Sequence, residues 1–171
     1  MRVLRQVLRT IDLINAWVAK TVAWVVVVII ATSIYEIVMR YVFNAPTDWV
    51  FEFNYLIHGP YFLLLGAYTF AINGHVNVDI IYARLSKRAR AVVDLFTMPL
   101  FFFFTLMMLV YGGRFAMNSL SFRETLSSAW APPIYPIKFA IPVAAFLLLL
   151  QGLAKYIRDL HLAFTGKEGA L

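Results

Sequence analysis

The sequence predicts an all-α integral membrane protein with four transmembrane helices. Four apolar runs, roughly 22–43, 50–72, 92–111 and 137–157, occupy most of the 171 residues. About 20 predominantly apolar residues cross a hydrocarbon core of ~30 Å, and buried helices of soluble proteins rarely stay apolar on every face for so long. Helices are expected because unpaired backbone groups are costly in lipid, and no alternating apolar and polar pattern indicates a barrel.

The whole chain, residues 1–171, is expected to form a single membrane domain. No internal repeat suggests two inverted transporter halves. The expected segments in chain order are an interfacial helix at 1–15, spans at 17–43 and 49–73, a second interfacial helix at 76–86, a span at 90–114, an outer loop at 115–136, a span at 137–159 and a cytoplasmic tail at 160–171.

The first segment is expected to be an amphipathic helix at the inner membrane surface. Basic residues recur on one side at intervals of three and four, and apolar residues fill the other side, which is typical of a helix lying in the interface. The polar side holds Arg2, Arg5, Arg9 and also Asp12, and the apolar side holds Leu4, Val7, Leu8, Ile11 and Ile14. Trp17 then marks the membrane boundary. The apolar run that follows is longer than a signal-peptide core, so the span should remain in the mature chain.

Ionisable residues at the outer ends of the first two spans are candidate sites because charges are costly in lipid. Glu36 lies about 24 Å above Lys20 at 1.5 Å per residue, and is therefore near the outer surface. Arg40 follows it at i+4, so a local ion pair is favoured over a functional role. Glu52 opens the second span, where it either complements the helix dipole or contacts another subunit.

The middle of the second span combines a titratable group with small residues. His58 is about 13 Å from the level of Trp49, and a hydrogen bond across helices is favoured over a proton-carrying role. Gly59 and Gly66 lie on one face, where another backbone could approach closely. Pro60 is expected to bend or loosen this helix.

These side chains form the expected contact surface for a larger membrane subunit. Its members are Glu36, Arg40, Glu52, His58, Gly59 and Gly66, with the alanines of span four, Ala140, Ala144 and Ala145, as an alternative to the glycines. Gln151 in the same span is a buried amide that needs a partner.

Two segments outside the spans carry further expectations. Val78, Ile81, Tyr82 and Leu85 follow helical spacing, which predicts the second interfacial helix on the cytoplasmic face. The outer loop ends in Trp-Ala-Pro-Pro-Ile-Tyr-Pro, and its prolines disfavour a regular helix there. Arg123, Glu124 and Trp130 in this loop are candidates to dock a periplasmic binding protein, although a loop that merely connects two spans fits equally well.

The distribution of basic residues predicts the orientation. Eleven of the 15 lysines and arginines lie in the N-terminal segment, the link between spans two and three, and the C-terminal segment. Because short basic loops stay inside, both termini are expected in the cytoplasm. The net charge of +6 is then a topological bias, and no nucleic-acid partner is inferred, although a basic patch would give the same total.

Several chemistries lack the residues they need. The chain has no cysteine, which excludes disulfides, Cys-ligated zinc and iron–sulfur clusters. No nucleophile, metal constellation or phosphate loop is evident, so we expect no enzyme activity and no cofactor. Two alternatives remain: an autonomous homodimeric proton-coupled exporter, for which Glu36 is the candidate acid, and a haem-binding respiratory anchor, for which only His58 is deep enough.

A motif in the second span and the segment after it resembles a known family. Glu52 and Gly66 precede the run Asn-Gly-His-Val-Asn-Val-Asp, whose family positions are Gly74, His75, Val76, Val78 and Asp79. The pattern resembles the small membrane subunit of tripartite ATP-independent periplasmic (TRAP) transporters. The resemblance covers nearly the whole chain in topology and about forty residues in motif.

The resemblance implies a division of labour between three proteins. A periplasmic substrate-binding protein captures an organic anion, and a large membrane subunit carries the substrate and sodium sites and moves as an elevator. The small subunit extends the static scaffold and holds no sodium itself. The implied location is the bacterial inner membrane, as a multi-pass protein in contact with phospholipids.

Overall fold

The computed structural model describes residues 2–72 and 85–165, and this part of the chain is helical. Its helices are α1 (Arg2–Ala23), α2 (Val25–Tyr41), α3 (Val50–Ala71), α5 (Lys87–Ser121), α6 (Tyr135–Lys138) and α7 (Ala140–Thr165). A single isolated β-bridge between Thr125 and Pro133 is the one strand-like feature of these residues. The predicted all-α class is therefore confirmed.

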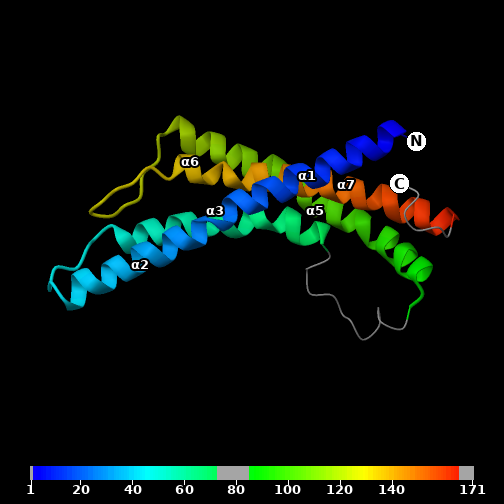
Figure 1. Cartoon of the computed structure of the whole chain (residues 1–171). Helices are drawn as coiled ribbons and strands as arrows, with labels where there is room; N and C mark the ends of the chain where they lie inside the picture. The colour runs from blue at the N-terminus through cyan, green and yellow to red at the C-terminus, as the bar shows by residue number, and fades with distance from the viewer. Residues whose placement is uncertain (1, 73–84, 166–171) are drawn as a thin grey trace.

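The helices form an elongated bundle (Figure 1). α5 and α7 pair most extensively, α3 packs on α7, and α1 crosses both α3 and α7. α2 continues the direction of α1 and packs mainly on α3. α1 begins and α7 ends at one end of the bundle, here called the terminal end. The α2–α3 turn and the α5–α6 loop lie at the opposite end, the loop end.

Three helices of the described residues are long and apolar enough to cross a membrane. They cover Val3–Tyr41, Arg88–Ser121 and Tyr135–Thr165. α3 has the expected length of 22 residues but is not among them, because Glu52, Asn54 and His58 lower its hydropathy. The chain is a multi-pass membrane protein, and the second of the four expected spans, at residues 49–73, stays a prediction.

The N-terminal boundary differs from the expected one. No helix end occurs between residues 15 and 17, and α1 continues to Ala23. The interruption falls at Trp24, whose amide donates to the carbonyl oxygen of Thr21 at 3.3 Å. The helix is continuous because this stretch holds no glycine or proline, and because Leu8 and Ala19 are both buried within the chain. The interfacial position of residues 1–15 stays a prediction.

The boundaries around the outer loop also differ. α5 runs to Ser121, beyond the expected end at 114, because Ala116 and Ser119 are buried against the rest of the bundle. The loop is therefore shorter than 115–136. α6 includes Pro136, which is tolerated because it stands in the first helical turn, where no intrahelical donor is needed. α7 continues to Thr165, so the expected tail from 160 begins as helix.

Small residues dominate the interior. The fully buried side chains include Ala67, Ala91, Ala116, Ala144, Ala145 and Ala154. Such residues let helix backbones approach closely, which is the usual basis of packing in membranes. A Cβ on Gly152 would clash with the ring of Phe101, and one on Gly112 would lie 2.5 Å from Cγ2 of Ile141. Ala144 and Ala145 are therefore internal, and the alternative that they contact a partner is wrong.

Candidate functional site

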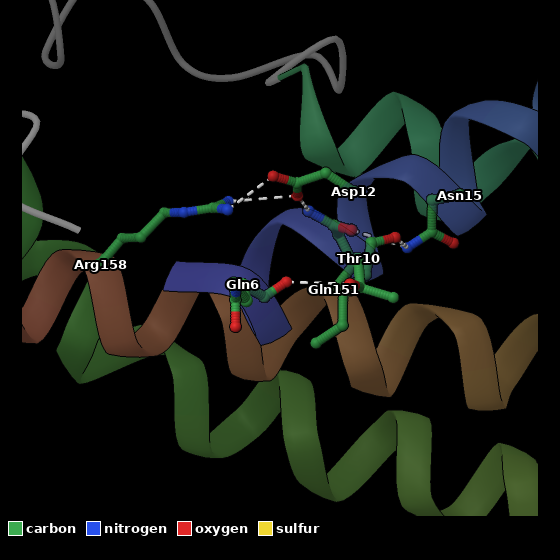
Figure 2. A network of polar contacts seen from close by, with 7 residues as sticks. Gln6, Thr10, Asp12, Asn15, Gln151 and Arg158 are labelled. Carbon is green, nitrogen blue, oxygen red and sulfur yellow. Dashed lines mark hydrogen bonds and ion pairs between the residues drawn. The ribbon is translucent and has the colours of Figure 1, made fainter. Parts of the chain in front are cut away.

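A polar cluster, buried at Asn15 and Gln151 and partly exposed at Asp12 and Arg158, joins α1 to α7. Figure 2 shows Asp12, Asn15 and Gln151 turned toward one another, with Arg158 reaching Asp12 from α7. The side-chain amide of Asn15 donates to Oε1 of Gln151 at 2.6 Å, and Nε2 of Gln151 donates to Oδ1 of Asp12 at 2.9 Å. Arg158 forms an ion pair with Asp12 at 2.6 Å. These four residues are called the α1–α7 junction, and they give Gln151 the partner that the sequence required.

A second ionic group joins α5 to α7 near the terminal end. Lys155 donates to the carboxylates of Asp94 on α5 and, at 2.6 Å, Asp159 on α7. Arg88 donates from the start of α5 to the carbonyl oxygen of Ala163 at 2.8 Å. A buried charge without a partner is strongly destabilising. At this end of the bundle these charges have partners in the same chain.

The expected ion pair at the outer end of the first span is confirmed. Arg40 and Glu36 are 2.6 Å apart at i+4. The second oxygen of Glu36 accepts from the backbone N–H of Thr47 at 3.1 Å and from its hydroxyl. Glu36 therefore also holds the turn between α2 and α3, where Asn44 has a φ of 49°. Its assignment to a partner contact stays a prediction.

Glu52 and Trp130 connect the outer loop to the start of α3. The carboxylate of Glu52 accepts from the hydroxyl of Ser128 at 2.7 Å. The ring of Trp130 lies 6.3 Å from that of Trp49, measured between centroids. One polar and one aromatic contact thus fix this side of the loop to the bundle.

Glu124 fixes the other side of the same loop. Its carboxylate accepts from Lys138 and, at 2.6 Å, from the hydroxyl of Ser119. The hydrogen bond from Lys138, and next that from Ser119, hold the pKa of Glu124 below its ordinary value of 4.5. Arg123 is exposed beside it with a φ of 46°, and Trp130 is 42% exposed. Two of the three predicted docking residues therefore face outward at least in part.

A hydrogen-bonded link between α2 and α3 was missed from the sequence. Oγ1 of Thr32 donates to Oδ1 of Asn54 at 2.6 Å, and Nδ2 of Asn54 donates to Oγ of Ser33 at 3.1 Å. The available signal was an amide inside an apolar run, the same signal that singled out Gln151. Asp12, Asn15 and Asp94 were missed because their positions near the ends of apolar runs suggest solvated side chains.

The predicted partner residues of α3 have different surroundings. His58 is exposed, with its ring 4.8 Å from that of Phe62 on the same helix. The expected hydrogen bond to another helix is not made within the described residues. Gly59 borders open space, whereas a Cβ placed on Gly66 would lie 4.0 Å from Cδ1 of Leu148 on α7. The family positions Gly74, His75, Val76, Val78 and Asp79, together with the second interfacial helix, lie outside the described residues.

Two grooves flank α3 at this level. One of about 730 Å³ lies between α3 and α6–α7 and includes His58 and Gly59. The other, of about 430 Å³, is bounded by α1–α2, α3 and α6–α7, and its walls are almost entirely apolar. Among residues 2–72 and 85–165, no group of three His, Cys, Asp or Glu side chains is placed to hold a metal ion.

Comparison with known proteins places this arrangement among transporter components. A family model described as "Tripartite ATP-independent periplasmic transporters, DctQ component" matches residues 29–162. The matched region contains most of α2, all of α3, α5 and α6, most of α7, and the outer loop. No curated protein matches the chain.

Proposed function

The chain belongs to the DctQ family, the small component of tripartite ATP-independent periplasmic transporters, and from that premise we propose that it is the non-catalytic scaffold subunit of such a transporter. In this role it binds a large, sodium-coupled elevator subunit. A periplasmic binding protein delivers an organic acid to the pair for import. The scaffold stays fixed in the inner membrane while the large subunit moves.

The pairing of the membrane carboxylates carries this proposal. Each carboxylate in a candidate spanning helix of the described residues has a cation from the same chain: Asp12 has Arg158, Glu36 has Arg40, and Asp94 and Asp159 share Lys155. Coupled transport needs a membrane acid or freed carbonyls that bind the ion in one state and release it in another. Carboxylates committed to structural pairs suit a static scaffold.

The exposed apolar surface of α2 supports the role in binding. α2 has no buried residue, and Ile30, Ile34 and Ile37 are each more than half exposed. Lipid covers such a surface without cost, and so does a larger membrane subunit. The scaffold thus offers a broad lateral surface while the carboxylates of its candidate spanning helices are paired internally.

The exporter alternative is disfavoured by the geometry at Glu36. An exporter would need this carboxylate to exchange a proton and a substrate. In the structure Glu36 accepts hydrogen bonds from Arg40 and Thr47, and so maintains the α2–α3 turn. Releasing those contacts in each cycle would disrupt the turn.

Reconstituted vesicles test the proposal. The chain alone, the large subunit alone, both subunits, and both with the binding protein are compared for sodium-driven uptake of organic acids. We expect uptake only when all three proteins are present. Accumulation of solute by vesicles that contain this chain alone would contradict the scaffold role.

The proposed orientation places both termini in the cytoplasm. It is supported by the excess of basic residues in the terminal segments and by the common position of the start of α1 and the end of α7. Because the chain has no cysteine, single cysteines report on one position each. In intact cells a membrane-impermeant maleimide should label Ala129→Cys in the outer loop and should not label Arg9→Cys in α1. The reverse pattern would invert the topology.

The outer loop is proposed to help dock the binding protein. Arg123 is exposed and forms no ion pair with another described residue, so it offers a positive charge to an incoming surface. Arg123→Glu should raise the concentration of binding protein needed for half-maximal uptake, and Arg114→Glu serves as a control on α5. Unchanged kinetics would assign the loop a purely connecting role.

A further inference from the structure

His58 exposes a polar ring at a depth where lipid offers no hydrogen-bond partner. It lies about 13 Å from the level of Trp49 at 1.5 Å per residue. Its ring contacts the rings of Tyr61 and Phe62 on its own helix, and it forms no hydrogen bond with the other described residues. A polar group turned toward hydrocarbon costs free energy. This face of α3 is therefore incomplete in the isolated chain.

Gly59 adds an open surface, and Pro60 removes one intrahelical hydrogen-bond donor. A Cβ placed on Gly59 would meet no heavy atom within 4 Å. Pro60 lies inside α3 and has no N–H, so it cannot donate to the carbonyl oxygen of Leu56 one turn earlier. In a membrane, a freed carbonyl needs a donor from a neighbouring helix, a side chain or water.

These groups border the groove of about 730 Å³ between α3 and α6–α7. The side chains that matter here are Ser33, Asn54, Tyr55, His58 and Ile141. The polar members lie on the α2–α3 side, and the rest of the wall is apolar. An acyl chain could fill the groove but would leave His58 without a partner, and water could bond to His58 but would wet the apolar side of the groove, which is unfavourable. A helix with one polar side chain would fill the apolar groove and would also give His58 a hydrogen-bond partner.

We propose that this groove receives a transmembrane helix of the large subunit. The incoming helix packs its backbone over Gly59 and places a hydrogen-bonding side chain, such as Ser, Thr, Asn or Gln, against His58. Small residues at such contacts allow close approach, and polar side chains fix the depth of the two helices. This inference rests on the proposed function, and it assigns the contact to one face of one helix.

Co-purification tests the assignment. The tagged chain is co-expressed with its large subunit, and the ratio of the two proteins is measured after detergent extraction. Gly59→Leu should lower that ratio about tenfold, because the added side chain occupies the space meant for the partner. His58→Leu should lower it roughly threefold to fifteenfold, the range of a hydrogen bond between membrane helices. His58→Asn keeps a donor and an acceptor and should restore most of the complex.

Gly113→Leu is the matched control, because this α5 glycine also has no heavy atom within 4 Å of an added Cβ. It should leave the ratio unchanged. All variants are first shown to elute from size-exclusion chromatography like the wild type when purified alone. If the wild type does not bind the large subunit, the proposed function fails. If the wild type binds and every variant binds equally well, only the present inference fails.

Cysteine cross-linking identifies the occupant directly. Tyr55→Cys on the groove and Phe104→Cys on α5 are about equally exposed in the chain. With single cysteines in the large subunit, Tyr55→Cys should form a cross-link between the two subunits, and Phe104→Cys should not. A cross-linked pair of two copies of this chain through Tyr55→Cys would overturn the inference in favour of self-association.

Discussion

The two halves of the long N-terminal helix show opposite relations between polarity and burial. α1 carries Asp12 and Asn15, yet Asn15 is only 2% exposed and Leu8 and Ala19 are buried beside it. α2 is mostly apolar, yet it has no buried residue. In a soluble protein the opposite assignment would be expected, because apolar surface is driven out of water.

The difference shows what holds this chain together in lipid. Hydrocarbon solvates an apolar helix as well as a neighbouring helix does, so apolarity gives α2 no reason to turn inward. Polar groups have no such solvent and must find one another, which draws α1 onto α7. The closed part of the molecule is therefore α1, α5 and α7, and the open part is the exposed surface of α2 and α3.

The largest expected effect on stability comes from comparing a glycine in the closed part, Gly152, with one in the open part, Gly59. A side chain at Gly152 would enter the space of the Phe101 ring, which is stacked 4.8 Å from Phe70, so the ring has little room to move. Gly152→Leu should lower the free energy of unfolding by about 3 kcal/mol. The measurement is unfolding of the purified chain by sodium dodecyl sulfate in mixed micelles.

Gly59→Leu is the matched variant in the open part, and it should leave the stability of the isolated chain within about 0.5 kcal/mol of the wild type. Gly152→Ala provides a milder test if the leucine variant does not fold. Equal losses at Gly152 and Gly59 would erase the distinction between the two parts.

The next largest effect on stability comes from comparing two polar residues inside spans, Gln151 and His58. Gln151 is 1% exposed and bonds to both Asn15 and Asp12. Gln151→Leu leaves the amide of Asn15 buried without this partner and should cost about 2 kcal/mol. His58→Leu should cost almost nothing in the isolated chain, because no hydrogen bond within the described residues is lost. The same unfolding assay measures both.

A double-mutant cycle sharpens the result for Gln151. If Asn15→Leu and Gln151→Leu act through their shared bond, the double variant should lose less stability than the two single losses added together. Additive losses would assign the effect of each variant to packing.

A smaller effect on stability is expected for the hydrogen bonds that join α2 to α3 within the open part. Asn54 bonds to Thr32 and Ser33 between α2 and α3, and its replacement by leucine removes both bonds. Asn54→Leu should lower the free energy of unfolding by about 1 kcal/mol, a typical value for hydrogen bonds between membrane helices. Thr69→Val is the control, since Thr69 bonds only to the carbonyl of Leu65 in its own helix. A loss as large as that of Gln151→Leu would show that α2 is held more firmly than its exposure indicates.

The smallest effect concerns pH and the outer loop. The pKa of Glu124 is lowered from 4.5, so its contacts are complete above that value and are lost as pH falls through the lower, folded-state pKa. A spin label on Ala129→Cys should therefore become more mobile only below about pH 4.5. In the Glu124→Gln background the label should not change over this range. A persistent pH step in that background would assign the titration to another group.

Much of the architecture was predictable because it depends on local sequence. Runs of apolar residues set the positions of α2, α3, α5 and α7, and the i+4 spacing of Glu36 and Arg40 set their ion pair. The ends of α1 and α5 were not predictable in the same way. Both helices continue past the expected boundaries because one face is buried by residues distant in the sequence.

The candidate site also has features that were predictable from the sequence and features that were not. The residues alone indicate that the chain is helical and lies in the membrane, and they predict His58 and Gly59 near mid-depth. Only the tertiary structure decided that Gly66 faces Leu148, that the alanines of α7 are internal and that Gln151 bonds to Asn15. The physical reason is that lipid and protein interior are equally apolar, so hydrophobic periodicity does not mark the inner face of a membrane helix.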